Sequence, residues 1–300
     1  MTAIAPSPST SHGIGGTVQK YLWNWQNQTV KAVYETLGQA GETVLLLPAF
    51  STVSTRAEMR GLAERLAPSF QVVVLDWLGF GESDRLPIDY RPELYHKFLE
   101  DFVKSVFNTP VAVVAAGHAA GYVMQLAVSQ AEVLSKIVLV APTWRGPLPT
   151  MGANRQIAGT VRQMVRTPLL GQLLYKLNTT PSFLKWMYRR HVYIDPSHLS
   201  DRFIHQKWQI TQQRGARYAP AAFVTGNLDP VRTREEFLAR FQNLSVPVMA
   251  VIGEQSPPQS KAEMEALSVV PGVQVQRLPG SLGLHEEYPE ALAEVIKPFL

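Results

Sequence analysis

The sequence predicts an α/β fold, a doubly wound and mostly parallel sheet into which one helical subdomain is inserted. Short apolar runs alternate with segments of helical spacing through the first half of the chain, and the same alternation returns near the C-terminus. Between them, residues 143–245 show helical patterning and no clear strand. Alternating strands and helices are typical of a parallel sheet with helices on both faces and right-handed crossovers.

The N-terminal region predicts a tail followed by a hairpin. Residues 1–18 are rich in Ser, Thr, Pro, Ala and Gly and lack the basic start and apolar stretch of a secretory signal, so we expect a flexible tail there. Residues 19–35 alternate apolar and polar side chains around Asn27 and Gln28. This pattern predicts two short antiparallel strands joined by a turn.

The remaining core elements follow from periodicity. Short apolar runs of four to seven residues indicate strands buried on both faces, and residues spaced three and four apart indicate helices. The strands are expected at 43–47, 72–75, 111–115, 136–140, 246–252 and 273–278, and the helices at 55–67, 92–107, 122–128, 261–267 and 289–299. The core is therefore expected to comprise residues 19–142 and 246–300.

Composition excludes several classes of protein. A hydrophobic content of 46% with 17% charged residues fits a large buried core rather than a disordered chain. The chain has no cysteine, which excludes disulfides, thiolate nucleophiles and Cys-ligated metals. The seven histidines form no metal-binding pattern, and we expect neither a metal nor a cofactor. No apolar run approaches the ~20 residues that span a bilayer, and we expect a cytoplasmic protein.

Charge is distributed unevenly along the chain. Residues 143–220 contain 12 Lys or Arg and only two acidic residues, Asp195 and Asp201, so this segment carries +10 while the rest of the chain carries −6. Its apolar residues form a broad stripe interleaved with cations that include Arg189 and Arg190. One interpretation is an amphipathic lid helix that packs on the core with solvated cations. The other is a surface that docks peripherally on an anionic membrane.

The most informative motif is Gly117-His118-Ala119-Ala120-Gly121, which directly follows a predicted strand and begins a helix. Glycines two residues before and after Ala119 allow a tight turn, and we expect Ala119 to be held in a strained conformation at the end of the strand. The alternative interpretation is a close-packed turn between strand and helix that has no chemical role.

Three further segments give the motif its context. Residues 45–50 (Leu-Leu-Leu-Pro-Ala-Phe) end one strand, residues 75–84 contain an Asp-x-x-Gly-x-Gly-x-Ser pattern, and residues 284–286 (Leu-His-Glu) follow the last strand. Together with the turn, they resemble the α/β-hydrolase superfamily across residues 20–142 and 246–300. The resemblance is to its helical-lid group, which includes epoxide hydrolases, haloalkane dehalogenases and esterases, and to cyanobacterial or plastid members.

The resemblance implies an incomplete catalytic triad. His285 matches the general base, and Phe50 and Ala120 match the backbone N–H donors of the oxyanion hole. Ala119 stands at the nucleophile position and Ser256 at the acid position. An alanine has no nucleophilic atom, and a serine does not stabilise an imidazolium as a carboxylate does.

Other residues are candidates for supporting roles. Trp77, His118 and Trp144 are expected to bind substrate, since ligands of open α/β sheets lie beyond the carboxyl ends of the strands. Asp229 or Glu254 is a candidate for a displaced catalytic acid. The alternative for Asp229, which precedes a proline, is a helix N-cap.

Three functional hypotheses remain open at this stage. The first is a protein that binds an apolar small molecule or lipid under a basic lid, with serine-hydrolase activity lost or very weak. The second is a lyase, hydrolase or cofactor-free oxygenase that uses His285 as a base without an acyl-enzyme. The third is an active esterase that carries an engineered Ser-to-Ala change at residue 119. A nucleic-acid partner is not expected, because no recognised nucleic-acid-binding module is present.

Overall fold

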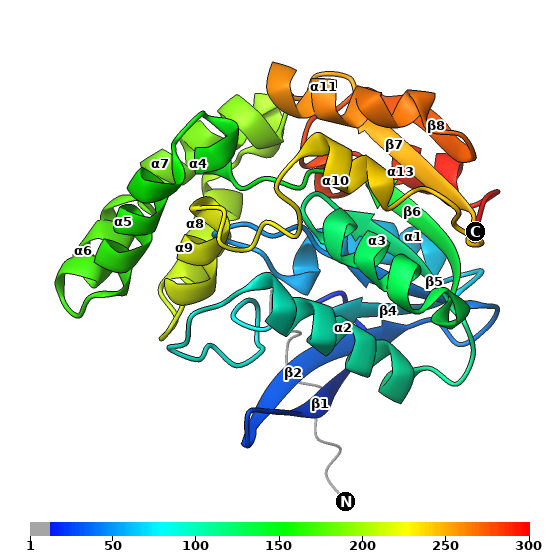
Figure 1. Ribbon diagram of the computed structural model, residues 1–300, viewed down its shortest axis with the longest axis horizontal. Helices are drawn as coiled ribbons and strands as arrows, with labels where there is room; N and C mark the ends of the chain where they lie inside the picture. Colours follow the sequence, from blue (N-terminus) through cyan, green and yellow to red (C-terminus); the bar gives the residue numbers. More distant parts are fainter. Residues whose placement is uncertain (1–12) are drawn as a thin grey trace, which may run out of the picture.

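The computed structural model describes residues 13–300, and its centre is an eight-stranded sheet (Figure 1). The spatial order of the strands is β1-β2-β4-β3-β5-β6-β7-β8. β1 and β2 are antiparallel to each other, β2 is antiparallel to β4, and the other neighbours are parallel. The strands are β1 (Thr17–Trp25), β2 (Gln28–Leu37), β3 (Thr43–Leu47), β4 (Gln71–Leu75), β5 (Val111–Ala116), β6 (Leu134–Val140), β7 (Val248–Gly253) and β8 (Val273–Leu278).

The N-terminal hairpin is confirmed, but the chain joins the fold earlier than predicted. Gln26 and Asn27 form its turn with positive φ angles of 48° and 63°. β1 begins at Thr17, and Ile14 is buried with its backbone N–H donating to the Glu35 carboxylate. The predicted tail boundary at residue 18 is therefore too late, and residues 1–12 lie outside the described part of the chain.

Helices cover both faces of the sheet because the central strands are apolar on both sides. In β3, Leu45 and Leu47 pack on one face and Val44 and Leu46 on the other. The first face is covered by α2 (Pro92–Val106) and α3 (Ala119–Ser129). The second face is covered by α1 (Arg60–Leu66), α12 (Leu284–Glu287) and α13 (Pro289–Ile296). At the sheet edge, α11 (Pro258–Glu265) packs on β7.

The predicted insertion lies between β6 and β7 and contains no strand within the described residues. Its first helices lie to one side of the sheet, with α5 and α6 farthest out (Figure 1). α10 packs instead into the main core through Phe237. The helices are α4 (Pro147–Thr150), α5 (Arg155–Arg166), α6 (Leu170–Leu177), α7 (Pro181–Met187), α8 (Asp201–Thr211), α9 (Tyr218–Val224) and α10 (Arg234–Ala239), with a π-helical turn, η3, at Tyr188–Val192.

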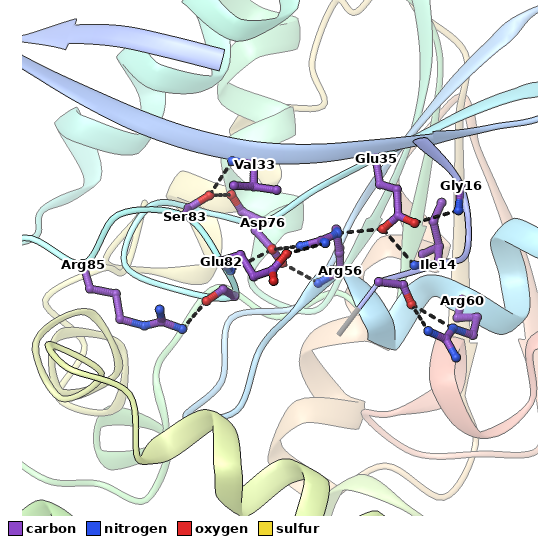
Figure 2. A network of polar contacts seen from close by, with 12 residues as sticks. Ile14, Gly16, Val33, Glu35, Arg56, Arg60, Asp76, Glu82, Ser83 and Arg85 are labelled. Carbon is purple, nitrogen blue, oxygen red and sulfur yellow. Dashed lines mark hydrogen bonds and ion pairs between the residues drawn. The ribbon is translucent and has the colours of Figure 1, made fainter. Parts of the chain in front are cut away.

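A buried ionic network joins the hairpin to the loops beyond β3 and β4 (Figure 2). Arg56, on the short helix η1 (Arg56–Met59), is fully buried and bonds to the carboxylates of Glu35, Asp76 and Glu82. Ser83 completes the network, because its Oγ donates to the Asp76 carbonyl and accepts from the Val33 N–H. Asp76 and Ser83 are the polar residues of the Asp-x-x-Gly-x-Gly-x-Ser pattern, so this motif stabilises the architecture.

Within the described residues, none of the helices combines the length and apolarity needed to cross a membrane.

Candidate functional site

The turn between β5 and α3 differs from the predicted one. Its positive φ, +52°, belongs to Gly117, whereas Ala119 is the first residue of α3 and is fully buried. A Cβ built on Gly117 would lie 3.1 Å from the Ala49 Cβ, so the loop after β3 packs directly against this glycine. The expected strain at Ala119 is therefore wrong. The apex of the turn is two residues earlier, at a position with no side chain.

The backbone N–H groups of Phe50 and His118, like that of Ala119 at the start of α3, have no acceptor within residues 13–300. Phe50 and His118 are both buried, and their rings are in contact with centroids 5.8 Å apart. The Ala120 N–H, in contrast, donates to the Gly117 carbonyl at 3.2 Å. The second N–H donor predicted beside that of Phe50 is therefore better matched by His118 than by Ala120, whose N–H is already bonded.

His285 lies on α12 and is paired with a carboxylate that the sequence did not indicate. Its Nε2 is 3.3 Å from Oε2 of Glu58, on η1 after β3. The other carboxylate oxygen of Glu58 accepts from the Thr55 N–H. Both side chains are buried, and Nδ1 of His285 has no partner among the described residues. The imidazole therefore directs one nitrogen to an acidic partner and leaves the other unbonded.

Three other residues were candidates for the acid position or for a displaced acid: Ser256 and Glu254 after β7, and Asp229 in the insertion. Ser256 is buried beside the end of β7, and its Oγ has no partner within residues 13–300. Asp229 accepts from the Gly146 N–H and lies 3.7 Å from Nε2 of His118, and α10 is capped by Thr233 instead. Neither Asp229 nor Glu254 is the carboxylate found on His285.

A second buried ion pair lies next to His285. Nζ of Lys207, on α8, is 2.7 Å from Oε1 of Glu286 and lies over the rings of Tyr188 and Phe203. Burial alone would lower the pKa of Lys207, but the carboxylates of Glu286 and Glu58 outweigh it and raise the pKa. The lysine therefore stays charged, and the insertion contributes a cation to the buried group that contains His285 and Glu58.

The predicted substrate-binding residues lie inside the core. Trp77 and Trp144 are fully buried, with Nε1 of Trp77 donating to the Pro48 carbonyl and Trp144 stacked on Phe237. His118 is also fully buried, and its Nε2 bonds to the Leu228 carbonyl at 2.8 Å. Burial lowers the pKa of His118 to about 4, so it is neutral at physiological pH. In this conformation the two tryptophans are core residues rather than the expected pocket walls.

The insertion is bonded to the loop that carries His285. Gly283 donates from its N–H to the Val192 carbonyl, and Oγ of Ser281 donates to the His191 carbonyl. The Glu287 carboxylate accepts from the N–H groups of Ile194 and Asp195. Residues 191–195 are therefore hydrogen-bonded to the loop and helix that carry His285.

Comparison with known proteins agrees with this architecture. The model of the alpha/beta hydrolase family matches residues 44–295. The chain belongs to this family. No functionally curated protein gives a significant match.

Solved structures share the fold at low sequence identity. Cfl2 from Burkholderia cenocepacia is 22% identical with a TM-score of 0.72, covering 94% of this chain and 96% of its own. The Cif epoxide hydrolase from Acinetobacter nosocomialis is 16% identical with a TM-score of 0.73, covering 94% and 89%. A thermophilic esterase from Thermogutta terrifontis is 19% identical with a TM-score of 0.70, covering 95% and 98%. At these identities, the likeness shows the fold alone.

Within the alpha/beta hydrolase family, the nucleophile sits at the apex of the turn after a sheet strand, and the next residue supplies an oxyanion-hole N–H. In this chain the apex is Gly117 and the next residue is His118. The nucleophile position is Ala119 if the motif is aligned by sequence and Gly117 if it is aligned by the turn. Neither residue carries a hydroxyl, thiol or carboxylate, so both alignments lack a nucleophilic side chain.

Sequence reasoning missed Glu58 and Lys207. Glu58 stands three residues after Thr55 at a helix start, which is an ordinary capping pattern. Lys207 lies in a helix with many polar residues, where a cation is usually solvated. The one available signal was Glu58's place just beyond β3, at the carboxyl edge of the parallel strands.

Proposed function

We propose that this alpha/beta hydrolase binds an apolar small molecule or lipid beneath its inserted lid and that its serine-hydrolase activity is lost or very weak. The observation that carries the proposal is the turn after β5, where Gly117 at the apex and Ala119 in the motif both lack a nucleophilic atom. Loss of a serine nucleophile costs on the order of 10⁶ in turnover, so no acyl-enzyme is expected.

The state of His285 supports the same conclusion. In a serine hydrolase, the imidazole takes a proton from the nucleophile and a carboxylate orients its other nitrogen. Here the bonded nitrogen, Nε2, contacts Glu58, while Nδ1 is unpartnered and Ser256 stands at the acid position. The imidazole is therefore not part of a nucleophile–base–acid relay.

A ligand with a small polar end and an apolar body fits the remaining chemistry. The unpartnered N–H groups of Phe50 and His118 are suited to a carbonyl or carboxylate oxygen. Around them, Phe50 packs with the aromatic rings of Trp77, Phe80, Tyr95, Tyr122 and Phe223. Because Phe50 and His118 are buried, binding requires the insertion or these rings to move.

The test compares the native chain with two serine variants. A fluorophosphonate probe should not label the native protein, which should also fail to cleave p-nitrophenyl esters above the buffer rate. Gly117→Ser should be labelled more than Ala119→Ser, because only residue 117 has the apex conformation. Binding of the fluorescent fatty acid cis-parinaric acid should be saturable in the native protein. Labelling of the native chain, or no saturable binding, contradicts the proposal.

One observation favours a second candidate function, catalysis with His285 as a general base and no acyl-enzyme. The His285–Glu58 pair is buried, and a carboxylate that bonds one imidazole nitrogen fixes the orientation of the ring. For this candidate, the native protein should turn over p-nitrophenyl esters without probe labelling. His285→Gln and Glu58→Gln should each lower that rate at least tenfold. A rate unchanged in both variants excludes it.

A further inference from the structure

Exposed apolar side chains are concentrated on the insertion. Of the 14 exposed large hydrophobic residues in the described chain, ten lie between residues 151 and 194. Leu169 is 88% exposed, and Leu173 and Trp186 are each 56% exposed. The full set is Met151, Ile157, Met164, Leu169, Leu170, Leu173, Leu177, Phe183, Trp186 and Ile194. A concentration of this kind on one segment marks an interaction surface rather than scattered surface residues.

The exposed residues follow helical spacing, so each helix presents an apolar outer face. On α6, Leu170, Leu173 and Leu177 are exposed, while Gly171 and Tyr175 are buried on the inner side. On α5, Ile157 and Met164 lie seven residues apart and are both exposed. On α7, the exposed rings of Phe183 and Trp186 contact each other with centroids 5.6 Å apart. These helices are therefore apolar on faces that the rest of the described chain, residues 13–300, does not cover.

All of the Lys, Arg, Asp and Glu residues in the same segment are cations. Residues 151–194 contain seven Lys or Arg and no Asp or Glu. Arg162 and Arg166 pair with Asp89 of the core, and Lys185 pairs with Asp201. Lys176, Arg189 and Arg190 are exposed and form no ion pair within the described residues. The apolar surface is thus bordered by free positive charge.

We propose that helices α5–α7 and the turn η3 form a docking surface for an anionic lipid bilayer. The occupant must accept leucine, methionine and tryptophan side chains and also supply negative charge next to them. A bilayer interface with anionic headgroups does both, since basic amphipathic helices bind it through apolar burial and electrostatic attraction together. Figure 1 shows α5 and α6 extending away from the sheet. This surface is independent of the ligand proposed above.

The experiment is co-sedimentation of the full chain with phosphatidylcholine vesicles, with or without phosphatidylglycerol. The native protein should sediment with the phosphatidylglycerol vesicles. Binding should weaken from 0.1 M to 1 M salt, because the Debye length falls from about 10 Å to about 3 Å. Reversing Arg189 and Arg190 to Glu should weaken binding by about fivefold for each unit of charge removed. With anionic vesicles, Trp186 emission should move to shorter wavelength, and Trp186→Phe should lose that shift.

Matched variants separate docking from general surface change. The triple variant Leu170→Gln, Leu173→Gln and Leu177→Gln should stay in the supernatant. The control triple Leu22→Gln, Val128→Gln and Val269→Gln changes apolar residues outside the insertion whose exposure is comparable to that of the α6 leucines. This control should bind as the native protein does. Three results would overturn the proposal: native protein that ignores anionic vesicles, control variants that lose binding equally, or a native dimer that the α6 triple variant dissociates without any vesicle binding.

Discussion

Two buried polar groups extend from the same short helix, and they differ in how completely they are bonded. Arg56, the first residue of η1, is surrounded by the carboxylates of Glu35, Asp76 and Glu82 (Figure 2). Glu58, two residues later, faces His285 beneath the insertion. Around Arg56, each charge has an opposite partner and the backbone supplies further donors.

Other buried polar atoms, next to η1 and on His118, Ser256 and His285, have no partner in the described chain. They are Oγ of Ser54, Oγ1 of Thr55, Oγ of Ser256, Nδ1 of His118 and Nδ1 of His285. A buried polar atom without a hydrogen bond reduces stability. A fully bonded network therefore stabilises the fold, whereas unbonded polar atoms are available to bind a ligand. The fully bonded group around Arg56 is therefore assigned to stability, and the incompletely bonded group that includes Glu58 and His285 is the candidate for function.

The largest expected effect is on the Arg56 network. Arg56→Met should lower the free energy of unfolding by about 3–5 kcal/mol, because Glu35 and Asp76 would remain buried without their cation. Urea denaturation measures this loss. As a control, Arg277→Met removes an exposed ion pair with Glu265 and should leave the midpoint nearly unchanged. Similar losses in both variants would show that Arg56 is not a structural centre.

The second prediction uses pH to distinguish the two regions. Burial lowers the pKa of His118 to about 4 from its ordinary 6.5, so below pH 6.5 the unfolded chain binds a proton that the folded chain does not. The free energy of unfolding should fall between pH 6.5 and 4, by about 1.4 kcal/mol per pH unit for this group. Burial also lowers the pKa of His96 to about 4, so it contributes in the same range.

Within the Arg56 network, Glu35 should lose its stabilising contribution only at lower pH. Burial would raise the pKa of Glu35. Its hydrogen bonds to Arg56 and to two backbone N–H groups outweigh burial and lower that pKa below the ordinary value of 4.5. A depressed carboxylate loses its stabilising contribution as the pH falls through the folded pKa. Urea titrations of the native protein and His118→Gln should therefore differ in slope above pH 4.5. Parallel curves there would contradict the assignment to His118.

The smallest expected effect comes from two buried serines. Ser83→Ala removes a hydroxyl that bonds to both the Asp76 carbonyl and the Val33 N–H, and should cost about 1–2 kcal/mol. Ser256→Ala removes an unpartnered hydroxyl and should change stability by less than about 0.5 kcal/mol or increase it. Thermal unfolding of the two variants side by side measures the difference. A larger loss of stability for Ser256→Ala than for Ser83→Ala would contradict the prediction, because it would mean that the Ser256 hydroxyl is hydrogen-bonded.

Most of the fold could be predicted from the sequence, because the apolar pattern depends on burial. The strand Val273–Leu278 agrees with its predicted bounds, and the helix predicted at 92–107 ends one residue earlier, at Val106. The start of β1 was misplaced, since the contact between Ile14 and Glu35 links residues 21 apart and leaves no local pattern.

The site was less predictable, because side-chain partners depend on the tertiary arrangement. The motif at residues 117–121 allows more than one alignment with a strained turn, and only the backbone angle shows that Gly117 forms the apex. Glu58 and His285 are separated by 227 residues, so no spacing rule relates them. Trp77 and Trp144 follow strands as pocket residues do, yet the rings of Phe50 and Phe237 pack against them.

The bonds between residues 191–195 and the loop of His285 have a mechanical consequence. Because Val192 and His191 accept from Gly283 and Ser281, a displacement of η3 either breaks these bonds or carries His285 with it. The Glu287 carboxylate adds a third attachment, at Ile194 and Asp195. As long as these bonds hold, the position of residues 191–195 and the position of the His285 loop are coupled. A force applied at the outer helices would reach His285 through one backbone hydrogen bond, from Gly283, and through the side chains of Ser281 and Glu287.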